Sequence, residues 1–172
     1  MSNAPPTTAA DARDLDAMKQ AIDASRRALA AGDMPYGAVL MSPSGEVLHV
    51  ASNNQNSARD CTGHAEMVLV REAESRLGLA ALRGATVYAS GEPCAMCAGA
   101  LYWAGVSRVV FGASQADIVA HGGTVLPVGV MEVLGTAQPA VRIEGPVLNE
   151  EAVAVLREAS LLSPLPQGRG LG

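Results

Sequence analysis

The first strong pattern along the chain is a helical one. Over residues 11–31 the apolar side chains fall on one side and the charged ones on the other, and the apolar set is Leu15, Met18, Ile22 and Leu29. Recurrence every three or four residues is typical of an amphipathic helix, and Gly32 suits its end. We therefore predict a helix over 11–31, preceded by a loose tail over residues 1–10.

Beyond this helix, short apolar runs typical of strands alternate with longer segments that carry helical spacing. The predicted strands are 36–41, 46–51, 85–89, 107–111 and 140–143. The predicted helices are 63–79, 94–103, 128–134 and 150–162. A Pro-Ser-Gly turn at 43–45 predicts a hairpin between the first two strands, and 53–62 is predicted as a polar loop. The Pro/Gly-rich residues 163–172 are predicted to be disordered.

The order of these elements predicts the fold class. Strands that alternate with helices need crossover connections, which produce a partly parallel sheet covered by helices on both faces. A chain of 172 residues buries about two-thirds of its surface on folding, which is enough for a core without staples. We therefore predict an α/β fold in a single domain over residues 11–162.

Composition and charge exclude several classes of protein. Charged residues make up 17% of the chain, the net charge is −5, and Lys19 is the only lysine, so a global positive field for nucleic acid is absent. Three cysteines are too few, and odd in number, for a disulfide framework, which favours a reduced cytoplasmic compartment. The chain shows neither a signal-peptide pattern nor an apolar stretch of about 18–20 residues that would span a membrane.

Two cysteines carry the strongest chemical signal. Cys94 and Cys97 belong to the run Pro-Cys-Ala-Met-Cys at 93–97, just after a predicted strand. Two cysteines three residues apart can hold either one cation or one disulfide. The free N–H groups at a helix start stabilise the thiolate form of such cysteines. A thioredoxin-like redox motif has the same placement, but it needs no histidine and leaves Glu66 without a role.

Zinc is the other interpretation, and two kinds of zinc site fit the residues. Cys61 and His64 together with Cys94 and Cys97 would make a closed structural site of four ligands. In a catalytic site, His64, Cys94 and Cys97 would hold the ion and water would take the open fourth position. Glu66 could then exchange protons with that water, whereas alone it would be an ordinary acid in a helix first turn. In this second case Cys61 is predicted to be a small buried residue.

These two motifs, His-Ala-Glu at 64–66 and Pro-Cys-Ala-Met-Cys at 93–97, resemble those of the zinc-dependent cytidine deaminase superfamily. The resemblance runs from about Met18 to Glu158, and it is closest to the branch that contains guanine deaminases and tRNA adenosine deaminases. Further points of likeness are Asn53 and the runs at 35–39, 91–93 and 108–112.

The resemblance implies a three-layer α/β/α cytidine deaminase-like fold around a central five-stranded mixed sheet, with zinc as the cofactor. It implies His64, Cys94 and Cys97 as the metal ligands. The implied reaction is hydrolytic deamination, in which zinc hydroxide attacks the amino-bearing carbon of a flat ring. Glu66 would carry the proton from water to the ring and then to the departing ammonia.

Four residues are expected at the substrate. Asn53 occupies the position that contacts the base or ribose in similar proteins, although its surroundings also suit a turn. Tyr36 and Trp103 are candidate walls of a ring pocket, with a strand core and a core or subunit-interface position as their respective alternatives. The backbone of Ala65 is expected near the reacting centre.

The expected substrate is a small nucleobase, nucleoside or similar heterocycle, with a purine-like ring favoured. Trp103 resembles a tryptophan of guanine deaminases, yet the acidic pair that follows the fourth strand in those enzymes is missing from 122–125. Deamination of adenosine in tRNA is the alternative, weakened because a stem-loop needs several Lys or Arg contacts to phosphate. A structural-zinc module is the lesser alternative. The resemblance also implies a homodimer, for which the apolar helix ending near Ala104 offers an interface.

Overall fold

The computed structural model of the chain describes residues 9–162. The predicted disordered tail over 163–172, and residues 1–8 of the predicted tail over 1–10, lie outside the described residues. The first helix, α1 (Ala9–Ala30), begins two residues before the predicted start at residue 11.

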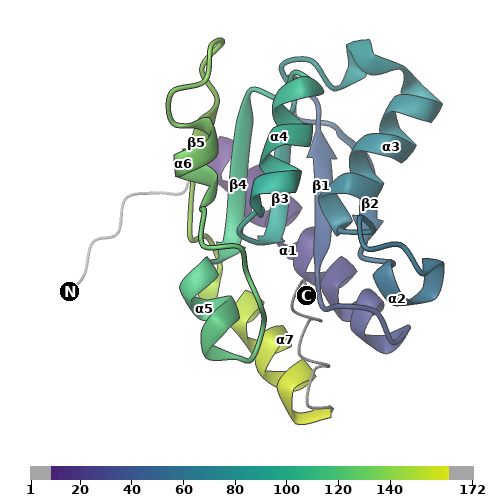
Figure 1. The fold of residues 1–172 in the computed structure, drawn as a ribbon. Coiled ribbons are helices and arrows are strands. Elements are labelled where there is room, and N and C mark those ends of the chain that lie inside the picture. The colour runs from purple at the N-terminus through teal and green to yellow at the C-terminus, as the bar shows by residue number, and fades with distance from the viewer. Residues whose placement is uncertain (1–8, 163–172) are drawn as a thin grey trace.

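A five-stranded mixed sheet forms the centre of the described chain (Figure 1). Its strands are β1 (Gly37–Met41), β2 (Val47–Ser52), β3 (Thr86–Gly91), β4 (Arg108–Ala113) and β5 (Arg142–Glu144). The spatial order is β2-β1-β3-β4-β5, in which β1 pairs antiparallel with β2 and β3, while β3, β4 and β5 run parallel. The predicted α/β class and the mixed five-stranded sheet are therefore confirmed.

Helices cover both faces of this sheet. The remaining helices are α2 (Gln55–Ala58), α3 (Ala65–Leu77), α4 (Ala95–Trp103), α5 (Gln115–Ala120), α6 (Val130–Leu134) and α7 (Asn149–Leu162), with a short 3-10 turn at Leu79–Ala81. α3, α4 and α6 pack on one face, whereas α1, α5 and α7 contribute to the core on the other (Figure 1). Within residues 9–162, none of the helices has the length and apolar character needed to cross a membrane.

The alternation of side chains along the strands creates the two cores. In β1, Leu40 faces α3 and α4, while its neighbours Val39 and Met41 face α1. Side chains of successive strand residues point to opposite faces, so a fully apolar central strand supplies both cores at once. Full burial of one leucine contributes about 1.5–3 kcal/mol, and Leu40, Leu69 and Leu101 are all fully buried.

Two helices lie where the sequence analysis predicts only loops. α2 occupies part of the predicted polar loop at 53–62. α5 follows β4 and begins with a capping box, in which the Ser114 side chain accepts from the Asp117 N–H and Asp117 accepts from the Ser114 N–H. Ser-x-x-Asp is a recognisable helix start, so the signal for α5 is present in the sequence.

An ion-pair cluster at the β4–β5 edge produces the first testable prediction. Arg108 Nη2 lies 2.6 Å from both Asp14 Oδ2 and Glu144 Oε2, and all three side chains are less than a third exposed. Hydrogen bonds from Arg108 lower the pKa of Asp14 from 3.8 and the pKa of Glu144 from 4.5. A carboxyl whose pKa is lower in the folded state stabilises the fold above its unfolded-state pKa, and this contribution is lost as pH falls through the folded-state value.

We therefore expect Arg108→Met to lower the free energy of unfolding by about 2 kcal/mol at pH 7, the scale of hydrogen bonds to charged groups. The difference from wild type should shrink as pH falls below the unfolded-state pKa values of the two carboxyls and through their lower folded-state values. Urea unfolding of both proteins at pH 7 and pH 3 checks this. A difference that stays constant across this range would show that Arg108 acts through packing instead.

Candidate active site

Two helix starts meet at one point of the molecule. His64 is the residue immediately before α3, and Cys94 is the residue immediately before α4. Both have extended backbone conformations, and neither side chain caps its own helix. The side chains are therefore free to turn toward one another, and Cys97 joins them from the first turn of α4.

The three side chains form a nearly equilateral triangle of donor atoms. His64 Nδ1, Cys94 Sγ and Cys97 Sγ are separated by 3.6 Å along each edge. In tetrahedral zinc sites the Zn–S distance is about 2.3 Å and the Zn–N distance about 2.0 Å. These values require two sulfur ligands to lie about 3.8 Å apart, and a sulfur and a nitrogen ligand about 3.5 Å apart. The residues are thus positioned to bind one zinc ion, as the sequence predicts.

Cys61 does not belong to this triangle. Among the described residues, the donor group that could hold a metal contains only His64, Cys94 and Cys97. The prediction that Cys61 is buried is wrong, because its side chain is exposed and lines the cavity beside the site. A closed site of four protein ligands is therefore not formed, and three ligands leave the open position that is typical of catalytic zinc.

Hydrogen bonding within the cluster favours a thiolate. The hydrogen bond from Cys97 lowers the pKa of the Cys94 thiol to about 4. The same bond, together with burial, raises the pKa of Cys97. The contact with Cys94 in turn raises the pKa of His64. A cation that enters the triangle meets one sulfur already ionised and can displace the remaining proton.

Glu66 is the acid of the site. It lies in the first turn of α3 with a side chain that is only 7% exposed, and its Oε2 is 3.6 Å from Cys97 Sγ. Burial raises the pKa of its carboxyl, because a low-dielectric environment disfavours the charged form. A buried carboxyl beside a metal site is suited to accept a proton and to return it.

A cavity of about 330 Å³ opens beside the triangle and Glu66. Its walls are mostly apolar, and its lining includes Tyr36, Met96, Ile118, Val125 and Leu126. Burial, followed by the nearby Glu66 charge, raises the pKa of Tyr36 to about 12, so its hydroxyl stays neutral and can donate. A cavity of this volume lies at the lower end of those that bind small molecules.

Gly91, at the end of β3, permits the close approach of Tyr36 to this cavity. A Cβ at residue 91 would lie 3.1 Å from two ring atoms of Tyr36. A side chain there would push the ring from its place, so glycine keeps this wall close to the sheet.

The other predicted substrate contacts lie less directly at the cavity. Asn53 is 2% exposed, and its amide binds Gln55: Oδ1 accepts from the Gln55 N–H at 3.0 Å and Nδ2 donates to Gln55 Oε1 at 2.9 Å. Ala65 is fully buried in the first turn of α3. Trp103 is 81% exposed at the end of α4, with its ring against Tyr102. Of the four predicted contacts, Tyr36 is the one that lines the cavity, whereas Asn53, Ala65 and Trp103 are not among its lining residues.

One wall of the cavity was not predicted from the sequence. Thr124, Val125 and Leu126 line it, and they come from the connection between α5 and α6. Glu92, which precedes the zinc-ligand motif, also lines the cavity. The apolar residues Val125 and Leu126, which follow the fourth strand in the sequence, are the signal that could have indicated a wall.

Comparison with known proteins adds a family. The model of the cytidine and deoxycytidylate deaminase zinc-binding region matches residues 11–113. A tRNA(Ile)-lysidine synthase of Deinococcus deserti is 36% identical over 144 residues, which cover 83% of this chain and 26% of that protein. A tRNA-specific adenosine deaminase of Bacillus subtilis is 44% identical over 96 residues, 56% of this chain and 59% of its own. This chain thus spans less than two-thirds of these two curated relatives.

Two further proteins match over most of their length. A probable cytosine deaminase of Schizosaccharomyces pombe is 31% identical over 151 residues, which cover 82% of this chain and 88% of that protein. A solved structure of guanine deaminase from Nitrosomonas europaea superimposes with a TM-score of 0.75 at 24% identity, covering 92% of this chain and 89% of that one. The latter similarity supports the fold alone.

Proposed function

Because the chain belongs to the cytidine and deoxycytidylate deaminase family, we propose that it is a zinc-dependent hydrolytic deaminase that releases ammonia from a small amino-substituted heterocycle, with a purine-like ring favoured. The observation that carries the proposal is the triangle of His64, Cys94 and Cys97 beside a buried Glu66. These groups face a small, mostly apolar cavity.

Each residue of the site has a role in this reaction. His64, Cys94 and Cys97 would hold the ion, which supplies a water molecule whose pKa is lowered from about 15.7 to about 7. The Glu66 carboxylate accepts a proton from that water and donates it to a ring nitrogen. It then takes the proton from the oxygen added to the ring carbon and transfers it to the leaving amino group. A C–O bond replaces the C–N bond, and one ammonia leaves for each water consumed.

The cavity favours a small flat ring as the substrate. Its volume of about 330 Å³ and its apolar lining suit a heterocycle, whose faces can lie against Tyr36 and Ile118. Tyr36 presents a neutral hydroxyl, and a neutral aromatic wall tolerates an uncharged ring. Asn53 binds Gln55 through both atoms of its amide, and its contact with a substrate stays a prediction.

Adenosine in tRNA is the second candidate substrate, because a tRNA-specific adenosine deaminase is 44% identical over 96 residues. Charge argues against it. The chain carries a net charge of −5 and one lysine, and each phosphate held by a protein requires a positive or hydrogen-bonding partner.

A parallel assay separates the two candidates. Zinc-loaded protein is incubated with amino-substituted purines, pyrimidines, pterins, triazines and nucleosides, and separately with unmodified tRNA anticodon stem-loops, and ammonia is measured in both. We expect release from one class of small ring and none from RNA. Release from the stem-loops alone would replace the proposed substrate, and silence from both sets with one zinc per chain would overturn the proposal.

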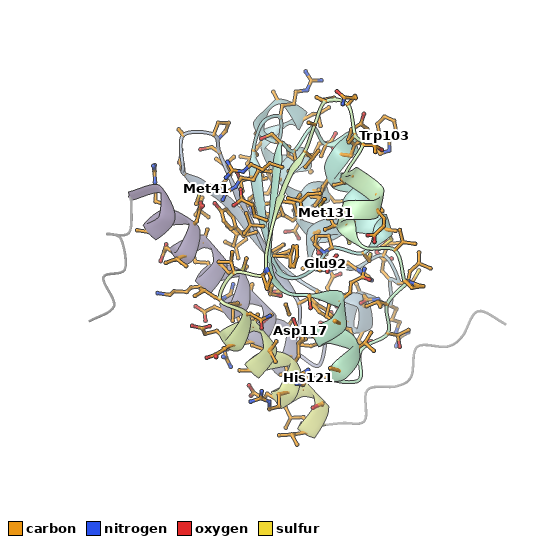
Figure 2. All side chains as sticks on the ribbon, turned by 90° about the vertical axis from the view of Figure 1, so that its left-hand side faces the viewer. Met41, Glu92, Trp103, Asp117, His121 and Met131 are labelled. Carbon is orange, nitrogen blue, oxygen red and sulfur yellow. The ribbon has the colours of Figure 1, made fainter. Side chains whose placement is uncertain are left out.

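Exposed apolar side chains on α4 and α6 support assembly into a homodimer. Trp103 is 81% and Met131 57% exposed, and Figure 2 shows the two on the same side of the molecule. Aromatic side chains and methionine are enriched at protein interfaces. We propose that this surface, defined by Trp103 and Met131, is where two copies of the chain meet.

The predicted cytoplasmic location stays a prediction.

Light scattering tests the dimer. We expect the wild-type protein to have the mass of two chains, and Trp103→Lys to have the mass of one, since a buried lysine at the interface would be unpaired. Val119→Lys is the matched control, because Val119 is 54% exposed on α5. Equal masses for Trp103→Lys and Val119→Lys would contradict this interface.

A further inference from the structure

The cavity wall formed by residues 121–129 has no regular structure of its own. This wall segment connects α5 to α6 and contributes Thr124, Val125 and Leu126 to the lining. Two of these side chains, Thr124 and Leu126, are exposed, and of the three it is Val125 that packs against the core. A connection with few buried contacts opens locally at low free-energy cost unless its ends are fixed.

One carboxylate binds the starts of the two helices that flank the wall segment. Glu92 Oε2 accepts the backbone N–H of Gln115 at 3.0 Å, and Glu92 Oε1 accepts the backbone N–H of Val130 at 3.2 Å. Gln115 is the first residue of α5 and Val130 the first of α6. Figure 2 shows Glu92 between α6, marked by Met131, and α5, marked by Asp117. The stretch from Gln115 to Val130, which consists of α5, the wall segment and the start of α6, is therefore closed into a loop by a single side chain.

Neighbouring contacts hold this arrangement. The Gln115 side chain donates from Nε2 to the Val128 carbonyl at 3.1 Å, which joins the two ends a second time. The Glu92 N–H donates to the Ala113 carbonyl at 2.7 Å, which ties the residue to the end of β4. A Cβ at Gly129 would lie 2.9 Å from Glu92 Oε1, so glycine lets the chain reach the carboxylate.

The position of Glu92 in the chain connects this wall to the metal site. Glu92 lies two residues before Cys94, in the short link from β3 to α4. The backbone that places a metal ligand thus also places the carboxylate that binds the start of α6, next to the wall segment. The distance between the wall and the triangle is set by a few covalent bonds and two charge-assisted hydrogen bonds.

We propose that Glu92 is a positioning residue that holds the wall segment against the cavity and thereby determines how tightly the ring substrate binds. The effect on substrate binding rests on the function proposed above, whereas the positioning of the wall segment by Glu92 does not. Because Glu92 acts through the wall and the reacting atoms are held by other residues, its removal should affect substrate binding more than turnover.

Hydrogen exchange tests the structural part without any substrate. In zinc-loaded Glu92→Ala we expect amides of residues 121–130 to exchange at least about tenfold faster than in wild type, since each lost hydrogen bond to a charged group costs about 1.5–3 kcal/mol. Exchange in α3 and β3 should be unchanged. Glu92→Gln keeps one acceptor oxygen and should lie between the two.

Glu132→Gln is the matched control. Glu132 lies in the first turn of α6, its Oε2 also approaches Gly129, and its carboxylate accepts no hydrogen bond among the described residues. Loss of its charge should leave exchange of the wall segment unchanged. If Glu92→Ala does not fold, exchange of the wall segment is measured in Glu92→Gln and Gly129→Ala instead. A Cβ at residue 129 would lie 2.9 Å from Glu92 Oε1 and would displace the Glu92 carboxylate.

Steady-state kinetics tests the binding part. We expect KM for the ring substrate to rise about tenfold or more in Glu92→Ala with kcat within about threefold of wild type, and to be partly restored in Glu92→Gln. Wild-type exchange at 121–130 in both Glu92 variants would overturn the structural proposal, even if no substrate is found. Faster exchange with unchanged KM would overturn the role in binding, while silence of the wild-type enzyme would count against the proposed function alone.

Discussion

Replacing Glu66 with glutamine should leave zinc bound and the fold intact while kcat falls by at least about 10²-fold, the scale of a general acid–base group. Glutamine has nearly the same shape as glutamate but cannot accept and return a proton. The side chain is 7% exposed and burial raises the pKa of its carboxyl, which suits a group that takes up a proton and returns it. Zinc content, thermal unfolding and ammonia release are measured on the same preparation.

Glu72→Gln is the control for this variant. Glu72 lies on the same helix, α3, but its carboxylate is about half exposed and pairs with His49 at 2.7 Å. Its removal should leave kcat unchanged. Full turnover by a folded, zinc-loaded Glu66→Gln protein would refute the proton-transfer role.

Replacing Cys97 with alanine should remove the metal and abolish activity. Two donor atoms 3.6 Å apart remain, and a site with two ligands binds zinc far more weakly than one with three. After dialysis against a chelator, wild type should keep about one zinc per chain, and the variant well under about a tenth. The bound zinc should raise the unfolding free energy of wild type only, because binding to the native state stabilises it.

Cys61→Ala distinguishes the two kinds of zinc site in this experiment. The structural-zinc interpretation requires Cys61 as the fourth ligand. In that case Cys61→Ala would lose its metal, as Cys97→Ala does. The geometry places Cys61 outside the donor group, and we expect it to keep its zinc. Loss of zinc from Cys61→Ala would contradict the open site.

The metal triangle could be predicted from the sequence because its information is local. The site residues come in two pairs, each at one helix start: His64 lies two residues before Glu66, and Cys94 lies three residues before Cys97. Spacing of two or three residues at a helix N-terminus fixes the relative directions of side chains. The strands were equally readable, since apolar runs of five or six residues form the buried sheet.

The cavity wall could not be predicted, because its place depends on contacts across the chain. Glu92 reaches Gln115 over 23 positions and Val130 over 38, and no short pattern encodes such a contact. Cys61 shows the opposite difficulty. Cysteine is among the most buried residue types, yet here a loop carries it to the open side of the cavity.

The central claim is that this site replaces an amino group by an oxygen atom from water. The most direct test is turnover of the substrate found in the assay, carried out in water enriched in oxygen-18, with mass analysis of the product and measurement of ammonia. The account predicts one labelled oxygen in each product molecule, one ammonia released with it, and neither from protein freed of zinc. Product without label, or equal turnover after removal of zinc, would contradict it.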